Sequence, residues 1–426
     1  MYSATMVTCF VLEGIVDGSS FLWLLRDRAV AAPHYKLTHH VRLDNRVEAH
    51  IDGLRVAGEV GWELAVEQLQ FEEAGELFAA SVLALESRDW VRIDRVIDVA
   101  ARLPDAARGL FSALGWVERA QLHGTVKALL DSDDPFRRRL GLIACALHRV
   151  DPGAHITAAL EDPEPGLRVR ALKAAGELGR ADLRTAVTAH LDDDDPAFRF
   201  RAAWAAVLLG ERGQALAQLF TIAADLASPW QAPALQLAPR LLTSHAAEAW
   251  FRDLGKEPAW RRLLITAIGV HGDPSYVPWL IEQMAEPVHA RVAGEAFSMI
   301  TGADLAYDDL ETDRPEGFES GPTENPEDED VALDPDEDLP WPAPELIARW
   351  WQANAARFAA GQRFLCGQPV AEAHCRQVLR TGFQRQRIAA ALELALMRAE
   401  RPLFEWRAPA FRQQAALKAG SGLGLG

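Results

Sequence analysis

The sequence lacks the features that mark several large classes of protein. Its 426 residues include four cysteines, none in a CxxC pair, so neither a disulfide framework nor a cysteine-based zinc site is expected. No apolar run approaches the roughly 20 residues that a membrane-spanning helix needs. No lysine or arginine precedes the short apolar run at the N-terminus, which argues against a secretory signal. These absences predict a reduced, cytoplasmic protein without a membrane segment.

Positive charge is also scarce. The chain has 44 lysines and arginines against 61 aspartates and glutamates, a formal net charge of −17. Residues 308–338 hold 15 acidic residues and one basic residue, so this segment carries −14 of that total. The rest of the chain is close to neutral. Binding to nucleic-acid phosphates normally needs a basic surface, so a nucleic-acid partner is disfavoured.

A repeat dominates the middle of the chain. Three stretches are similar: "DDPFRRRLGLIACALH" from Asp133, "PEPGLRVRALKAAGELG" from Pro163 and "DDPAFRFRAAWAAVLLG" from Asp194. Equivalent residues lie 31 positions apart: Pro165 and Pro196, Arg168 and Arg199, Arg170 and Arg201, Gly179 and Gly210. Arg137 and Arg139 fit this frame if one residue is missing after Pro135, and Pro258, Arg261 and Gly272 follow two periods later. Such a period with helical spacing inside each unit predicts a stack of helix pairs, an all-α solenoid.

Each repeat opens with the residues of a helix start and continues with small residues. An acidic residue caps the free amides of the first turn, and proline fits the first helical position. Alanines in the following helix allow neighbouring helices to approach closely. We therefore expect residues 120–303 to form antiparallel helix pairs without a β-sheet.

Four segments are predicted along the chain. Residues 1–119 form a helical N-terminal cap, 120–305 hold the repeats, 306–342 form an acidic insert, and 343–426 hold C-terminal helices and a flexible tail. The insert is rich in proline and glycine and has almost no periodic apolar residues. This composition is typical of a disordered segment.

The block "DPEPGLRVRALKAAGELG" resembles the HEAT repeat, whose first helix carries proline, arginine, small residues and a final glycine. Most of the chain resembles a bacterial HEAT-repeat family of the PBS-lyase-like, armadillo type, to which no activity is assigned. The residues concerned are "FLWLLRDRAVAAPHYKLTHHVRLDNRVEAHIDGLRVAG" from Phe21, "RVAGEAFSMITGADL" from Arg291, and "RFLCGQP" and "LRTGFQRQRIAAALELAL" near the C-terminus. Members are often encoded near type VI secretion components, which implies an accessory or adaptor role. The resemblance implies no reaction and no catalytic residue.

Arginines recur at matching repeat positions, so stacking should align several of them as a ladder. They are Arg137, Arg139, Arg168, Arg170, Arg199, Arg201, Arg261 and Arg291. One interpretation is structural: each arginine bonds the carboxylates or carbonyls at the start of a neighbouring unit, such as Asp162 or Asp194. The other is an anion-binding strip, since the guanidinium fork suits carboxylate and phosphate.

Two adjacent tryptophans, Trp350 and Trp351, form a second candidate surface. Adjacent residues on a helix cannot both face one core, so one of the pair could be exposed at a protein interface. Packing of both against the last repeat is the alternative.

The sequence offers little for metal or covalent chemistry. It contains no His-Glu dipeptide, which HEAT-repeat di-iron hydroxylases use. The densest polar cluster comprises His39, His40, Asp44, Glu48, His50 and Asp52. Within it, His40, Asp44 and Glu48 share one helix face at successive i,i+4 steps and could hold a metal. A polar helix face is the favoured interpretation. We expect no metal, no cofactor and no catalytic residue.

The predicted function is a protein-binding scaffold or adaptor, not an enzyme, that binds another protein through its curved surface. The resemblance implies that it is accessory to a type VI secretion system. Two alternatives stay open. One is an immunity or inhibitor protein whose acidic segment blocks a basic toxin. The other is a glycosylase- or lyase-like enzyme on the same scaffold, which would need a basic groove, aromatic residues and a catalytic carboxylate.

Overall fold

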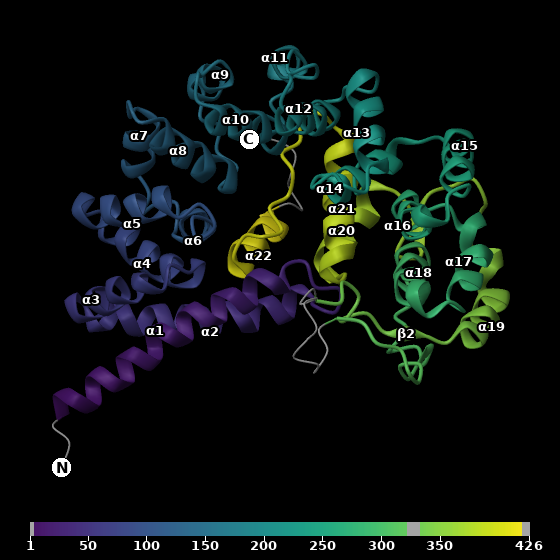
Figure 1. Cartoon of the computed structure of the whole chain (residues 1–426), viewed down its shortest axis with the longest axis horizontal. Coiled ribbons are helices and arrows are strands. Elements are labelled where there is room, and N and C mark those ends of the chain that lie inside the picture. The colour runs from purple at the N-terminus through teal and green to yellow at the C-terminus, as the bar shows by residue number, and fades with distance from the viewer. Residues whose placement is uncertain (1–3, 322–332, 420–426) are drawn as a thin grey trace. The chain divides into compact units, whose positions relative to one another are not determined.

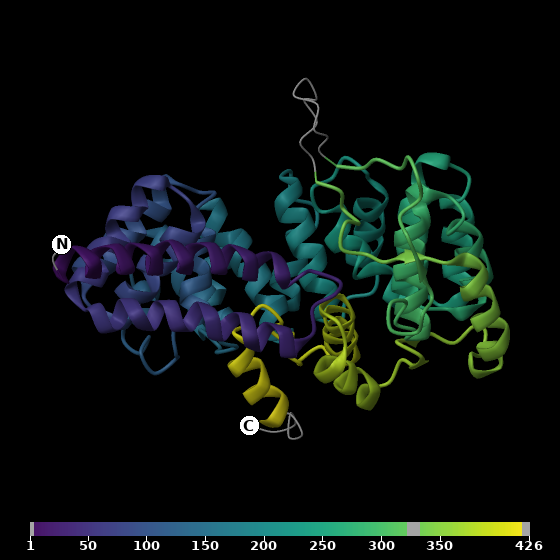
Figure 2. The same cartoon turned by 90° about the horizontal axis from the view of Figure 1, so that it is seen from below.

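The computed structural model describes residues 4–321 and 333–419 (Figures 1 and 2). They divide into two compact units. Unit 1 comprises 4–31, 35–210 and 398–419 of these residues, and unit 2 comprises 32–34 and 211–397. The boundary at residue 210 lies inside the predicted repeat block, and the last described helix belongs to unit 1. The predicted four-segment division therefore differs from the compact units.

Unit 1 has helices and no β-strand among its described residues. Its helices are α1 (Ala4–Ala29), α2 (Leu37–Ala57), α3 (Glu59–Glu67), α4 (Ala74–Ser87), α5 (Trp90–Arg102), α6 (Arg108–Trp116), α7 (Thr125–Leu130), α8 (Pro135–Leu147), α9 (Ala154–Leu160), α10 (Pro165–Leu178), α11 (Arg184–Thr188), α12 (Pro196–Leu208) and α22 (Ala410–Ala419). α1 and α2 lie side by side (Figure 2). Helices α4, α6, α8, α10 and α12 pack in succession and form an inner layer, while α5, α7, α9 and α11 form an outer layer (Figure 1).

The repeat helices begin where the sequence chemistry predicts. The side chain of Asp134 accepts a hydrogen bond from the backbone N–H of Phe136, and Asp195 caps α12 in the same way. Proline occupies the first helical position of α8, α10 and α12.

Small residues set the close spacing of the inner layer. Ala175 and Ala206 are completely buried. A Cβ atom added to Gly176 would lie 2.9 Å from the Cα of Ala205, so only glycine lets α10 and α12 approach this closely.

Unit 2 continues the helix pairs and adds two short ribbons. Its helices are α13 (Gln214–Ala224), α14 (Gln231–Leu235), α15 (Ser244–Leu254), α16 (Arg261–His271), α17 (Val277–Gln283), α18 (Pro287–Thr301), α19 (Pro344–Asn354), α20 (Glu372–Thr381) and α21 (Gln384–Met397). Its strands are β1 (Glu311–Thr312), β2 (Trp341–Pro342), β3 (Phe364–Leu365) and β4 (Gln368–Pro369). Both ribbons are antiparallel: β1 pairs with β2 through Thr312 and Trp341, and β3 pairs with β4 through Leu365 and Gln368. Residues 120–303 contain no strand, so the predicted all-α helix-pair solenoid is confirmed.

The described ends of the acidic insert make defined contacts. Asp336 binds Arg262 through two hydrogen bonds, of 2.6 and 2.7 Å, and Asp334 lies 2.6 Å from Arg291. The insert also supplies Trp341 to the first ribbon. The predicted disorder therefore does not apply to 333–342, because arginines of α16 and α18 neutralise these carboxylates. Residues 322–332 lie outside the described residues.

Candidate functional site

A basic pocket is the main chemical feature of unit 1. It has a volume of about 440 Å³ and is walled by the inner-layer helices α6, α8, α10 and α12 together with the C-terminal segment 403–412. Nine cationic side chains line it: Arg26, Arg108, Arg139, Arg149, Arg170, Lys173, Arg201, Arg407 and Arg412. Only two carboxylates do so, Glu177 and Glu405. Four aromatic side chains complete the wall: Phe111, Trp116, Trp204 and Trp406. A strongly basic site thus exists on a chain whose net charge is negative.

Arginines hold the C-terminal segment in place as one wall of the pocket. Arg149 pairs with Glu405 at 3.0 Å and donates through Nε to the carbonyl of Leu403 at 2.5 Å. The backbone N–H of Leu403 in turn donates to the carbonyl of Glu177 on α10. The wall is therefore joined to α10 through the backbone and to the connection after α8 through the side chain of Arg149.

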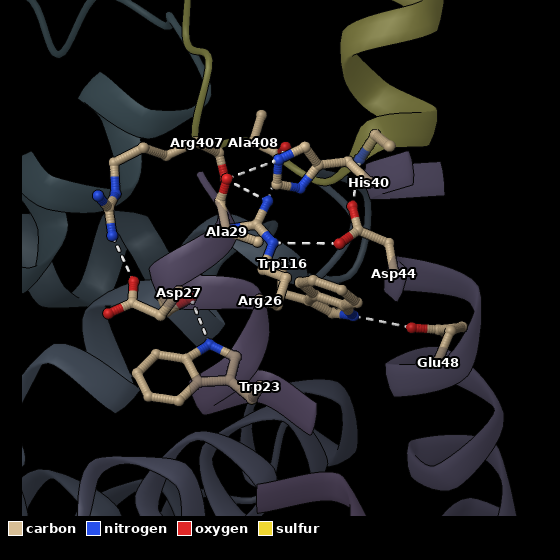
Figure 3. A network of polar contacts seen from close by, with 12 residues as sticks. Trp23, Arg26, Asp27, Ala29, His40, Asp44, Glu48, Trp116, Arg407 and Ala408 are labelled. Atoms are coloured by element: carbon tan, nitrogen blue, oxygen red, sulfur yellow. Dashed lines mark hydrogen bonds and ion pairs between the residues drawn. The ribbon is translucent and has the colours of Figure 1, made fainter. Parts of the chain in front are cut away.

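Arg26 anchors the next part of this segment (Figure 3). Its Nε lies 3.1 Å from Asp44 Oδ1, and its Nη2 donates to the carbonyls of Arg407 and Ala408 at 2.6 and 2.9 Å. Asp44 Oδ2 accepts from the backbone N–H of Ala410 at 2.6 Å. One buried ion pair between α1 and α2 thus fixes the start of α22.

The polar cluster on α2 has partners other than a metal ion. His40 Nε2 lies 3.1 Å from a backbone carbonyl, and Asp44 pairs with Arg26. Glu48 accepts from the indole N–H of Trp116 at 2.7 Å (Figure 3). Within residues 4–321 and 333–419 no group of three or more His, Cys, Asp or Glu is arranged to hold a metal. These contacts favour the polar helix face as the interpretation of the cluster.

Three arginines spaced 31 residues apart line the pocket together. Arg139, Arg170 and Arg201 lie on α8, α10 and α12, which pack in succession. Arg170 donates to Glu177 at 2.6 Å. Burial raises the pKa of Glu177, but Arg170, Lys173 and Arg149 outweigh this and lower it to about 2. Glu177 is therefore ionised at neutral pH and fixes the middle arginine.

The outer two members of this ladder are not paired with a carboxylate, although Glu164 lies near Arg139 and Glu177 lies near Arg201. Arg139 lies over the ring of Phe111 at 5.4 Å, and Arg201 lies over Phe200 at 5.0 Å. Neither forms an ion pair or side-chain hydrogen bond with any residue that the structure describes, and Arg139 Nε is buried without a partner. Burial lowers the pKa of both side chains. A guanidinium that has lost part of its water without forming an ion pair favours an incoming anion.

The other predicted arginines of unit 1 have structural roles. Arg199 donates to the carbonyls of Asp193 and Asp194, both at 2.7 Å, and Arg168 lies over Phe198 at 4.6 Å. Arg137 pairs with Asp94 at 2.9 Å and does not line the pocket.

The frame predicted around Pro135 needs a correction. Arg138, not Arg137, is the counterpart of Arg199: it donates to the carbonyls of Ser132 and Asp133 that precede its own helix. α8 and α12 both begin at the proline three residues earlier. No residue is missing after Pro135 at this point of the helix.

The predicted sites in unit 2 are occupied by packing contacts. Arg261 donates to Gln283 at 3.3 Å and lies over Trp279. Trp350 packs edge-on against Phe297, with ring centres 5.4 Å apart. Trp351 packs against Phe358 at 5.3 Å. These contacts favour the packing interpretation of the tryptophan pair.

Sequence reasoning missed most of the pocket. Arg26 and Arg108 come from α1 and α6, and Arg407 and Arg412 come from the C-terminal segment. No shared period links them, so no pattern in the sequence could group them. The tertiary fold alone brings them to the repeat helices.

His148, beside the pocket, is expected to make the stability of unit 1 depend on pH. Its Nε2–H donates to the carbonyl of Leu114 at 2.8 Å, and its Nδ1 accepts from Arg412 at 2.9 Å. Burial, followed by the charge of Arg412, lowers the pKa of His148 from 6.5 to about 4. The unfolded chain therefore binds a proton at a higher pH than the folded chain does. Stability is expected to fall as the pH drops from about 6.5 towards 4.

Urea unfolding at pH 7 and pH 5 tests this expectation. Both values lie above the ordinary pKa of glutamate, so carboxylates contribute little to the difference. His148→Gln should reduce the loss of stability between the two values. The assignment is wrong if the variant and the parent lose the same amount.

Comparison with known protein families supports the repeat type that the sequence predicted. Residues 153–236 match the family model of HEAT repeats. No curated protein sequence matches the chain. In residues 4–321 and 333–419 no helix combines the length and apolar character needed to cross a membrane. Helices α10 and α12, which carry Arg170 and Arg201, therefore lie in a region similar to HEAT repeats.

Proposed function

We propose that this chain is a protein-binding adaptor whose unit 1 pocket holds an acidic segment of a partner protein. The observation that carries the proposal is the pair of half-buried arginines that form no ion pair, Arg139 and Arg201, on either side of Arg170 in the pocket. HEAT repeats commonly serve as protein-interaction scaffolds, and stacked repeats of this type present extended binding surfaces.

The chemistry of the pocket suits carboxylates. A charged group that is removed from water is stabilised when an opposite charge with good hydrogen-bond geometry replaces the lost hydration. The guanidinium fork can bind both oxygens of a carboxylate. Glu177 and Glu405 hold Arg170 and Arg149 in position, so these side chains lose little freedom when a ligand arrives.

The cellular setting follows from the sequence resemblance rather than from the pocket. We infer a cytoplasmic adaptor that is accessory to a type VI secretion system. Its partner would be a component with an exposed acidic segment. Capture of secretion components by the full chain, and loss of that capture when Arg139 and Arg201 are replaced, would support this setting.

Peptide binding tests the pocket directly. A fluorescent peptide rich in Asp and Glu should bind the full chain, and Arg139→Ala with Arg201→Ala should weaken binding about tenfold or more, because two charge-assisted contacts are lost. The matched control is Arg42→Ala with Arg46→Ala, which removes two exposed arginines of α2. The control should change the Kd less than about twofold. Equal weakening in both variants would show general charge attraction and contradict the proposal.

A nucleic-acid enzyme is the second candidate, because the pocket combines cationic and aromatic side chains with a buried carboxylate. Glu177, however, is bound by Arg170 and Lys173, which leaves it poorly placed to act on a substrate. A duplex oligonucleotide serves as counter-ligand in the same assay. If it bound more tightly than the acidic peptide and depended on Arg139 and Arg201, the enzyme would replace the adaptor as the better proposal.

A further inference from the structure

Unit 2 contains an acidic segment that is already bound to arginines of the helices α16 and α18. Asp336 forms a two-bond contact with Arg262 on α16, and Asp334 contacts Arg291 on α18. The helices α16 and α18 pack against each other. One short segment therefore neutralises arginines from two neighbouring repeat helices.

A turn brings the two carboxylates together. The backbone N–H of Asp336 donates to Asp334 Oδ1 at 2.9 Å, and the backbone N–H of Leu339 donates to the carbonyl of Asp336 at 2.8 Å. The side chains of Asp334 and Asp336 are only 11% and 5% exposed. Asp338 differs, because its side chain is 56% exposed and lies 3.6 Å from His34 Nδ1. Only the first and third residues of the Asp-Pro-Asp sequence take part in the arginine contact.

The arginines involved occupy matching positions in the two units. Arg262 and Arg291 lie four residues after Pro258 and Pro287, which open their repeats. Arg139 lies four residues after Pro135 in the same way. Arg170 and Arg201 come one residue later in their helices. In unit 1 these arginines line a pocket, and no acidic segment among the described residues binds Arg139 or Arg201.

We propose that the pocket of unit 1 recognises an Asp-x-Asp turn in the partner protein. Two carboxylates, two residues apart and presented by a turn, bridge arginines of neighbouring repeat helices, as Asp334 and Asp336 do between α16 and α18 in unit 2. This inference rests on the proposed function and specifies the acidic segment that the adaptor binds.

The probe is a peptide with the sequence of residues 333–339, Leu-Asp-Pro-Asp-Glu-Asp-Leu, added to the full chain. Three variant peptides carry Asp334→Asn, Asp336→Asn or Asp338→Asn, and all three have the same charge. The first two should bind about fivefold more weakly or worse, because each loses one arginine contact. The third should change less than about twofold, because its carboxylate makes no arginine contact in unit 2.

Protein variants show where the peptide binds. Arg139→Ala with Arg201→Ala should abolish the difference between the peptides and weaken the parent peptide about tenfold. Unchanged binding in this variant would mean that the peptide exchanges with the bound segment of unit 2, which overturns the inference. Equal weakening by all three asparagine substitutions would show that charge alone matters, and would also overturn it.

Two further outcomes separate this inference from the proposed function. If inorganic tripolyphosphate displaced the peptide at lower concentrations than free peptide did, the site would prefer phosphate and the Asp-x-Asp inference would be wrong. If the Asp/Glu-rich peptide bound and depended on Arg139 and Arg201 while the Asp-x-Asp peptide did not bind, the adaptor proposal would stand and only the turn would be rejected.

Discussion

Replacing Glu393 by alanine should destabilise unit 2 by about 3–5 kcal/mol, because it leaves a buried guanidinium without a counter-charge. Glu393 on α21 is 3% exposed and accepts from Arg240 Nη1 at 2.8 Å and from Arg363. The side chain of Arg240 is 1% exposed, so water cannot replace the lost carboxylate. Urea unfolding followed by circular dichroism would measure the loss.

The control for Glu393 is a surface pair in the same unit. Glu248 and Arg252 on α15 form an i,i+4 pair at 2.5 Å, with side chains 59% and 65% exposed. Glu248→Ala should cost about 0.5 kcal/mol or less, since solvent screens both charges. Similar losses for the two variants would mean that Glu393 is not needed to neutralise Arg240.

In unit 1, Asp44→Ala should also cost about 3–5 kcal/mol. The Asp44–Arg26 pair is 3% exposed on both sides, and Asp44 also accepts from the backbone N–H of Ala410 (Figure 3). The variant loses the ion pair and one tie to the C-terminal segment. Hydrogen exchange of the amides in 403–412 should therefore become faster.

A partly exposed pair between α5 and α8 provides the comparison for Asp44. Asp94 contacts Arg137 at 2.9 Å, but its side chain is 44% exposed. Asp94→Ala should cost about 1 kcal/mol or less and leave the exchange of 403–412 unchanged. If Asp44→Ala left the exchange of that segment unchanged as well, Arg26 and Asp44 would not anchor it.

The parts of the fold that depend on local chemistry could be predicted from the sequence. An acidic residue followed by proline marks the start of α8, α10 and α12, and alanine and glycine mark the faces where they pack. These signals act within a few residues and recur with each repeat. The 31-residue spacing therefore predicted that Arg170 and Arg201 would lie on stacked helices.

The same period could not separate pocket arginines from structural ones. Arg199 and Arg201 are two positions apart on one helix, yet Arg199 bonds the carbonyls before its own helix and Arg201 lines the pocket. A difference of two positions turns a side chain by about 200° around the helix axis. Whether an arginine side chain then faces solvent, a backbone carbonyl or other arginines depends on the elements packed around its helix. The repeat pattern does not specify those elements.

The acidic insert shows a related limit. Its composition is typical of disorder because it contains too few apolar residues to bury a core. Asp334 and Asp336 are nevertheless fixed, because Arg291 and Arg262 supply the opposite charge from α18 and α16. The composition of a segment indicates only whether that segment could fold by itself. It carries no information about arginines some 40 to 75 residues earlier in the chain that bind its carboxylates in the folded protein.

The sequence by itself determined the helical class, the start of each repeat helix and the order in which neighbouring repeats stack, because these depend on local hydrogen bonding and on contacts between adjacent units. Only the tertiary structure decided the basic pocket. Its walls come from α1, α6, three repeat helices and the segment 403–412, which returns to unit 1 from the far end of the chain. Long-range packing and buried ion pairs such as Arg26–Asp44 bring these parts together. Contacts between residues that are distant in the sequence produce no repeating pattern, so the sequence alone could not predict the pocket.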